Sequence, residues 1–115
     1  MITKKSVSKL VTEYGPFDMV VFDTEHLKDN ILLYKIGDGD PVLRVQSHCL
    51  TSTAFDSTQC DCDAQLKLGL RAIASSDFGI LVYLNQEARG NGLHAKAKVL
   101  RHLNMGMSLG EAQIE

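Results

Sequence analysis

Residues 47–63 read S-H-C-L-T-S-T-A-F-D-S-T-Q-C-D-C-D and contain all three cysteines of the chain, Cys49, Cys60 and Cys62. Three thiols cannot pair completely into disulfides, and the two cysteines of the C-D-C pair are poorly placed to bridge each other. Three thiolates and one water are a common ligand set for a catalytic zinc ion, which keeps one coordination position open. The spacing therefore favours a zinc site, and the alternative is three unrelated buried cysteines.

The composition is that of a small domain without a strong electrostatic field. The 115 residues suffice for one domain with its own core. Lys and Arg number 12 and Asp and Glu number 14, so the net charge of −2 argues against generic nucleic-acid binding. No apolar stretch is long enough for a membrane span, and the N-terminus lacks a secretion signal. With three clustered cysteines, this predicts a soluble, cytoplasmic protein without membrane or nucleic-acid partners.

The hydrophobic pattern predicts an α/β fold, a mixed β-sheet with helices packed on it. The predicted elements are a helix over 6–14, strands over 17–22, 31–36 and 42–45, a helix over 63–74, a strand over 79–84 and a helix over 92–103. The turn sequence G-D-G-D-P at 37–41 predicts that its two flanking strands form an antiparallel hairpin. The cysteine segment is expected to be an irregular loop. The last helix is expected to bury Leu93, Ala97 and Leu100.

A second chemical signature is Q-E-A-R-G-N-G-L at 86–93, between a predicted strand and a predicted helix. Strand ends in α/β folds are frequent ligand sites, and a glycine-containing loop that opens a helix offers backbone N–H groups to a phosphate. Arg89 adds a bidentate donor for the same anion. The alternative is an ordinary strand-to-helix turn that contains one arginine.

Three motifs in register resemble the GTP cyclohydrolase II family, the zinc enzymes that open riboflavin biosynthesis. They are R-V-x-S-x-C-L-T at 44–51, C-D-C-x-x-Q-L at 60–66 and Y-L-x-Q-E-x-R-G-x-G-L at 83–93. The segments Y-G-x-F at 14–17 and G-D-G-D-P-V-L-R-V at 37–45 fit as well. The resemblance therefore covers essentially the whole chain.

The resemblance implies a zinc-dependent hydrolase. Zinc would be held by Cys49, Cys60 and Cys62, with a water in the open position, and the guanine imidazole ring of GTP would be opened with release of formate and, in the family, of pyrophosphate. Mg²⁺ on the nucleotide phosphates and assembly into a homodimer are also expected from the family. By their place in the motifs, the residues expected to contact the guanine nucleotide are Arg44, Val45, Gln46, Ser47, His48, Gln65, Glu87, Ala88 and Arg89.

The chain departs from the family's motifs at several site positions. Gln46 and His48 stand where the family has His and Glu, which removes a carboxylate beside the metal and the nucleotide. Ala88 adds a methyl group within the family's E-G-R, and Leu100 stands where the family carries a tyrosine proposed to assist catalysis. The remaining departures are Gln59 for arginine and Asp63 for glycine.

The catalytic residues are unknown from the sequence, because the family's Asp and Arg pair that acts on the phosphate lies downstream of residue 115. We expect a single GTP cyclohydrolase II-like domain over 1–115 that lacks the family's C-terminal segment. Three functions agree with this pattern. The first is a GTP cyclohydrolase II-type hydrolase, and the second is a divergent zinc amidohydrolase that acts on another purine- or pyrimidine-derived substrate. The third is a non-catalytic zinc-stabilised domain that binds a nucleotide or a partner protein.

Overall fold

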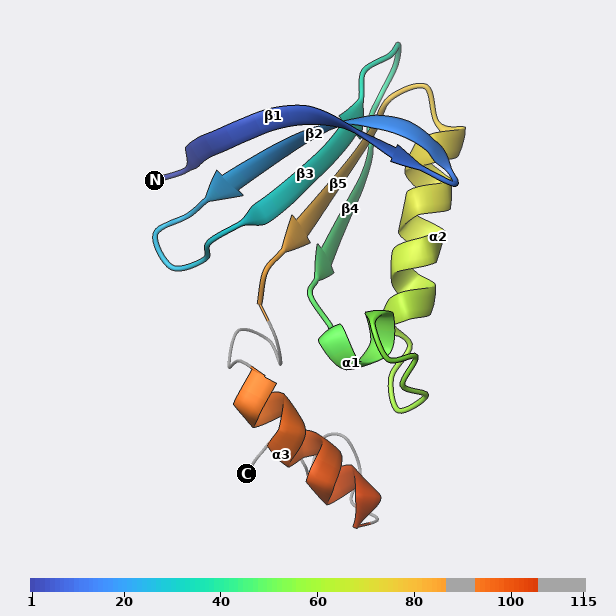
Figure 1. The fold of residues 1–115 in the computed structure, drawn as a ribbon. Coiled ribbons are helices and arrows are strands. Elements are labelled where there is room, and N and C mark those ends of the chain that lie inside the picture. Colours follow the sequence, from blue (N-terminus) through green and yellow to red (C-terminus); the bar gives the residue numbers. More distant parts are fainter. Residues whose placement is uncertain (87–92, 106–115) are drawn as a thin grey trace.

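A mixed β-sheet forms the larger part of the structure, a computed structural model that describes residues 1–86 and 93–105 (Figure 1). Within these residues the elements are β1 (Thr3–Thr12), β2 (Gly15–Asp23), β3 (Asn30–Lys35), β4 (Val42–Ser47), α1 (Leu50–Thr53), α2 (Cys62–Ser75), β5 (Gly79–Leu84) and α3 (Leu93–Asn104). The strand order is β1-β2-β3-β5-β4, with β4 parallel to β5 and the other neighbours antiparallel. The predicted α/β class, a mixed sheet with helix packed on it, is confirmed.

The predicted helix over 6–14 is wrong, because residues 6–12 belong to the strand β1, which pairs with β2 along its length, and residues 13 and 14 form the turn between the two strands. Val7, Leu10 and Val11 have the spacing of a helix face, but Val7 and Val11 are 57% and 81% exposed and only Leu10 packs against the core. Gly15, expected to stop a helix, has a φ of 121° and opens β2. A glycine there lets the chain reverse tightly, so the backbone of 3–12 finds its partners in β2.

The predicted hairpin is also wrong, although both of its strands exist. The segment 37–41 joins β3 to β4, but β5 lies between them in the sheet. The chain leaves β4, passes through α1 and α2, and returns as β5 parallel to β4. Parallel neighbours need such a crossover, and the uninterrupted apolar run of β5 suits a strand with neighbours on both sides.

The later elements follow the prediction closely. Helix α2, strand β5 and helix α3 begin and end within one residue of the expected positions. The cysteine segment is not wholly irregular, because the single turn α1 lies inside it. The inward face expected for α3 is wrong, since Leu93 and Ala97 are exposed and His102 is buried. Helix α3 lies beyond the ends of β4 and β5 rather than on the sheet (Figure 1), so its apolar stripe has no sheet face to cover.

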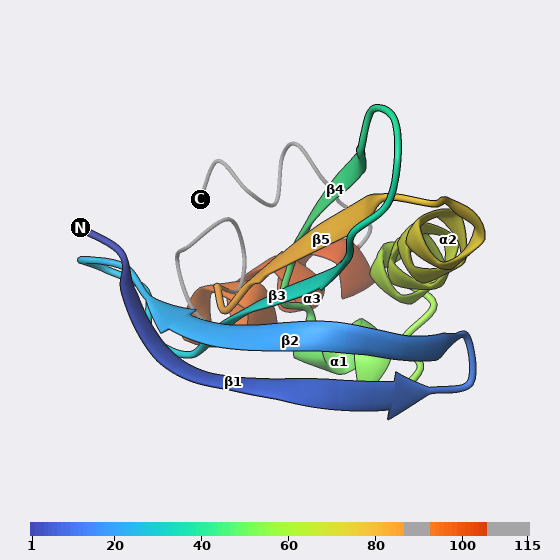
Figure 2. The same cartoon turned by 90° about the horizontal axis from the view of Figure 1, so that it is seen from above.

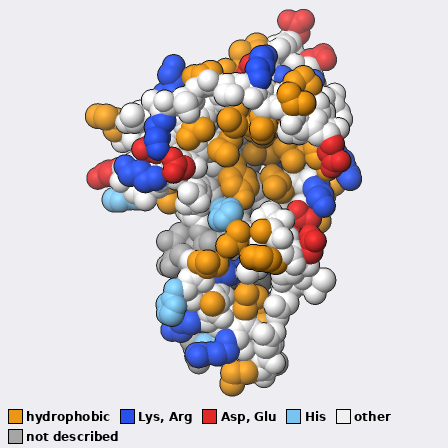
Figure 3. Space-filling view, viewed as in Figure 1, with side chains coloured by type: hydrophobic (Ala, Val, Ile, Leu, Met, Phe, Trp, Pro, Cys, Tyr) orange, Lys and Arg blue, Asp and Glu red, His pale blue; other side chains and the backbone are white. Residues whose placement is uncertain are grey.

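The hydrophobic core lies between the sheet and α2, which Figure 2 shows almost end-on beside the strands. Its buried members are Phe17, Leu33, Ile73 and Leu81. Gly69 faces the sheet, and a Cβ there would lie 3.3 Å from Leu81 Cδ1, so glycine allows the helix to approach closely. Half-buried residues surround this core, and Figure 3 shows apolar side chains at the surface between the strands and α2. No helix among the described residues is long and apolar enough to cross a bilayer.

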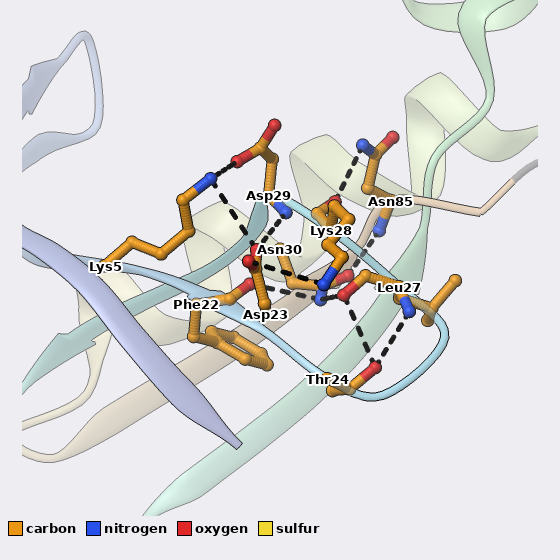
Figure 4. Close-up of polar contacts among 9 residues, drawn as sticks. All are labelled: Lys5, Phe22, Asp23, Thr24, Leu27, Lys28, Asp29, Asn30 and Asn85. Atoms are coloured by element: carbon orange, nitrogen blue, oxygen red, sulfur yellow. Dashed lines mark hydrogen bonds and ion pairs between the residues drawn. The ribbon is translucent and has the colours of Figure 1, made fainter. Parts of the chain in front are cut away.

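A buried asparagine joins the β2–β3 turn to the end of β5 (Figure 4). Asn30 is completely buried, and its amide Nδ2 donates to the carbonyl oxygens of Phe22 and Leu27, at 3.2 Å each. Its Oδ1 accepts the backbone N–H of Asn85 at 2.9 Å. Because a buried amide must find partners for its polar atoms, Asn30 holds the end of β5 against this turn.

We expect Asn30→Ala to lower the free energy of unfolding by about 2–4 kcal/mol, because it leaves buried backbone groups without their partners. Urea denaturation followed by circular dichroism measures this change. The matched control is Lys5→Ala, which removes exposed ion pairs to Asp23 and Asp29 in the same network and should have only a small effect. Equal effects of the two variants would contradict the assignment of Asn30.

Candidate metal centre

The three cysteine side chains converge at the end of the sheet where β4 and β5 finish. The Sγ atoms of Cys49, Cys60 and Cys62 all lie within 4.8 Å of one another, and the Sγ atoms of Cys49 and Cys60 are 3.6 Å apart. All three are free thiols. A tetrahedral zinc with Zn–S bonds of about 2.3 Å needs its sulfurs about 3.8 Å apart. The donor set and its spacing therefore fit a zinc ion with three protein ligands.

The parallel strand pair positions the first of these thiols. The backbone N–H of His48 donates to the carbonyl oxygen of Leu84 at 2.8 Å, which continues the β4–β5 pairing by one residue. Cys49 follows at the N-cap of α1 and is 4% exposed. Its carbonyl oxygen accepts the hydroxyl of Thr53 at 2.7 Å and the backbone N–H of Thr53 at 3.0 Å. Cys49 is thus held by both the sheet and α1.

The other two thiols lie at the start of α2. Cys60 precedes the helix and Cys62 is its first residue. The side-chain amide of Gln46, on β4, donates to the carbonyl oxygen of Cys62 at 3.2 Å. Exposed N–H groups and the helix dipole at this end favour negative charge on sulfur. The helix predicted over 63–74, directly after the C-D-C pair, is confirmed and begins one residue earlier, at Cys62.

The thiols do not ionise equally when no cation is bound. Burial, together with the hydrogen bonds and charges of the Cys49 and Cys60 thiols, raises the pKa of Cys62 to about 12. Burial also acts to raise the pKa of Cys60, but hydrogen bonds from the Cys62 backbone N–H and from neighbouring side chains outweigh it and lower that pKa. Ionisation of one thiol thus opposes ionisation of its neighbours. A cation is needed to hold all three sulfurs as thiolates.

Successive side chains of β4 point to opposite faces of the sheet, which separates the residues predicted to bind the nucleotide. The side chain of Arg44 faces α2, with its Cγ 3.7 Å from the position of a Cβ on Gly69. Gln46 lies on the same face, whereas Val45 and Ser47 point to the opposite one. The five consecutive residues from Arg44 to His48 therefore do not form one continuous contact surface.

His48 contacts Tyr83, a residue that the sequence analysis did not assign to the site. His48 Nδ1 and Tyr83 Oη are 2.7 Å apart, and the two rings meet edge to face. Tyr83 lies in β5 opposite Gln46. Only the parallel register of β4 and β5 brings these residues together, so the sequence carried no local signal for this contact.

The other predicted site residues are placed as follows. Gln65 is exposed on α2, and its side-chain amide donates to Asp61 at 3.1 Å. Leu100 is half-buried in α3. Gln86 donates to the hydroxyl of Ser47 at 3.0 Å, so the segment that leads to residue 87 begins beside the end of β4. Glu87, Ala88 and Arg89 lie outside the described residues.

A pocket of about 280 Å³ lies beside Cys60. Among its lining side chains are three carboxylates, of which Asp63 pairs with Lys67 at 2.9 Å. These carboxylates oppose a phosphate by like charge. The complete lining consists of Ser52, Asp56, Ser57, Cys60, Asp61, Asp63 and Ala64.

The mixed sheet, with its helical crossover from β4 to β5, and the cluster of three thiols define an α/β protein. Its candidate metal centre lies where β4 and β5 end. The family comparison then identifies the group to which it belongs. The model of the GTP cyclohydrolase II family matches residues 3–115. The chain therefore belongs to the GTP cyclohydrolase II family, as its motifs predicted.

The curated relatives that match this chain carry the name of the same family. A GTP cyclohydrolase-2 of Neisseria meningitidis is 38% identical over 117 residues, which cover 99% of this chain and 59% of the relative. One of Pseudomonas aeruginosa is 42% identical, with 96% of this chain and 56% of the relative covered. One of Picrophilus torridus is 34% identical, with 100% and 62% covered. The chain thus spans less than two thirds of the length of these relatives.

We expect zinc binding to release protons and to weaken as the pH falls. The pKa of about 12 means that the Cys62 thiol is protonated at neutral pH without metal, and this proton must leave when the sulfur becomes a ligand. Calorimetric titrations in two buffers of different ionisation enthalpy count the released protons. Binding with no proton release at pH 7 would contradict the thiol assignment.

Proposed function

We propose that the chain carries the zinc-binding and guanine-nucleotide-binding part of a GTP cyclohydrolase II-type hydrolase. Such an enzyme opens the imidazole ring of GTP with water and releases formate. The observation that carries this proposal is the cluster of three sulfurs within 4.8 Å, at the edge where β4 and β5 end. Membership of the family supports the same reaction.

Each part of the centre has a definable task in this reaction. Cys49, Cys60 and Cys62 would hold the ion, and zinc, when bound, supplies a Lewis acid with an open coordination position. The almost complete burial of Cys49 keeps bulk water from one side of the cluster. The hydrogen bond from Gln46 to the Cys62 carbonyl oxygen fixes the strand edge against the helix.

The nucleotide contacts form the second part of the proposal. Arg44 supplies a cation on the α2 side of the sheet, and Glu87, Ala88 and Arg89 follow directly after Gln86, which is held at the same edge. Two arginines could then neutralise the phosphates, with Mg²⁺ bound among their oxygens. Val45, Ser47, His48 and Gln65 complete the proposed contacts.

A second candidate function is hydrolysis of another purine- or pyrimidine-derived substrate. His48 is held by Tyr83 at a position where the family's motif has a carboxylate, so this chain presents a differently charged group beside Cys49. The carboxylates around the neighbouring pocket also favour a ligand with fewer phosphates. The third candidate, a non-catalytic zinc-stabilised domain, predicts metal binding without turnover.

We expect the purified chain to bind one zinc ion per molecule and to release formate from a guanine compound. Metal content is measured by mass spectrometry, and formate is assayed with GTP, GDP, GMP and guanosine. Formate from GTP supports the first function, whereas formate only from the compounds with fewer phosphates supports the second. Zinc without formate from any of them overturns both and leaves the non-catalytic domain.

Removal of one thiol tests the ligand set itself. Cys60→Ser should lower zinc content to near zero, because a serine hydroxyl is a poor ligand for this ion and two thiolates bind it far more weakly. Asn104→Ala is a suitable control, since Asn104 accepts a hydrogen bond from Gln59 next to Cys60 but offers no thiol. Full zinc content in Cys60→Ser would show that the ligands are assigned wrongly.

We further propose that the chain forms a homodimer in the cytoplasm. Three free thiols suit a reducing compartment. The sheet face opposite α2 carries exposed apolar residues, including Val7, Leu43 and Val45, which are 57%, 60% and 62% exposed. Exposed apolar side chains gathered on one face are typical of an interaction surface.

We expect Leu43→Glu combined with Val45→Glu to convert a dimer into monomers, because it places charges on this sheet face. Size-exclusion chromatography with light scattering gives the mass. Leu68→Glu is the matched control, since Leu68 is 51% exposed on α2 and lies away from that face. A wild-type chain that is monomeric at high concentration would contradict the homodimer.

A further inference from the structure

A buried serine lies between the two segments that carry the thiols. Ser52 is in α1, three residues after Cys49, and is 1% exposed. Its Oγ accepts the backbone N–H of Asp63 at 2.8 Å. Ser52 and Cys60 also line the same pocket. One side chain of α1 therefore joins the segment that carries Cys49 to the start of α2, beside Cys60.

The Ser52 oxygen is the acceptor in this hydrogen bond, because a backbone N–H only donates. Because Ser52 is buried, water does not compete for the contact, and the hydrogen bond is stronger than at the surface.

The contact with Asp63 replaces a helix cap that α2 does not make for itself. The first N–H groups of a helix have no partner within the helix and need one from elsewhere. Asp61, at the N-cap of α2, makes no side-chain capping hydrogen bond. Ser52 satisfies one of these groups from α1, and it thereby fixes the first turn of α2, where Cys62 lies, relative to Cys49.

We propose that Ser52 is a positioning residue of the metal centre. Its hydroxyl holds the first turn of α2, which begins with Cys62, at a fixed place relative to Cys49, so that the sulfurs surround one ion before it binds. This inference rests on the proposed zinc site and adds to it a residue that binds no metal. Outer groups of this kind orient metal ligands and commonly change metal affinity by about 10–100-fold.

The test compares zinc affinity in Ser52→Ala and in wild type by competition with a chromophoric chelator. We expect the dissociation constant for zinc to rise by about 10–100-fold in the variant. The absorption spectrum of the Co²⁺-loaded protein should shift as well, because the Cys62 sulfur is no longer held in place and its bond to the metal changes. A purely structural role would destabilise the metal-free and metal-loaded proteins equally and would leave both readouts unchanged.

Two further variants complete the experiment. Ser57→Ala makes the same chemical change in the same pocket, but the Ser57 hydroxyl accepts the N–H of Gln59 and not one at the start of α2, so zinc affinity should stay at the wild-type value. Ser52→Thr keeps the hydroxyl and should retain most of the affinity, and it supplies the comparison if Ser52→Ala does not fold.

The outcomes separate this inference from the proposal on which it rests. Wild-type zinc affinity and an unchanged cobalt spectrum in Ser52→Ala overturn the role of Ser52 and leave the metal centre intact. Loss of affinity in Ser52→Thr equal to that of a deleted hydroxyl also overturns it. A wild-type chain that binds neither zinc nor cobalt overturns the metal centre itself.

Discussion

The parallel pairing of β4 with β5 is the constraint on which the rest of the structure depends. It requires the chain to leave the sheet after β4 and to return through a helix, and the cysteine segment occupies this crossover. The first thiol is consequently placed by the end of a strand and the other two by the start of a helix. The hydrogen bond from His48 N–H to Leu84 continues the pairing up to the residue before Cys49. Strand pairing and metal-ligand geometry are therefore parts of one arrangement.

The second constraint on this part of the structure is the distribution of charge around the three thiols. Burial and the neighbouring Cys49 and Cys60 thiols raise the pKa of Cys62 to about 12, so three anionic sulfurs within 4.8 Å of one another need a cation. Carboxylates line the pocket on one side of the cluster, and the only basic residue of β4, Arg44, lies on the face toward α2.

Much of the site could be predicted from sequence, because its ligands lie close together in the chain. The C-D-C pair and the helix that follows it are local features, and so are the boundaries of α2 and β5. The helix over 6–14 failed because an apolar spacing of three and four residues occurs by chance in a strand whose exposed side carries Val7 and Val11. The predicted hairpin is wrong because a turn sequence indicates only that the chain reverses. It does not indicate that a later strand, β5, lies between the two strands that the turn connects.

The sequence by itself determined the family, the mixed α/β class and the three thiols that could bind a metal. These depend on motif order and residue type, which need no knowledge of distant contacts. Only the tertiary structure decided that β5 separates β3 from β4, that His48 meets Tyr83, and that Ser52 of α1 caps the start of α2. Each of these is a contact between segments far apart in the chain or across a loop. Strand register and burial select such contacts, and neither can be read from a single stretch of residues.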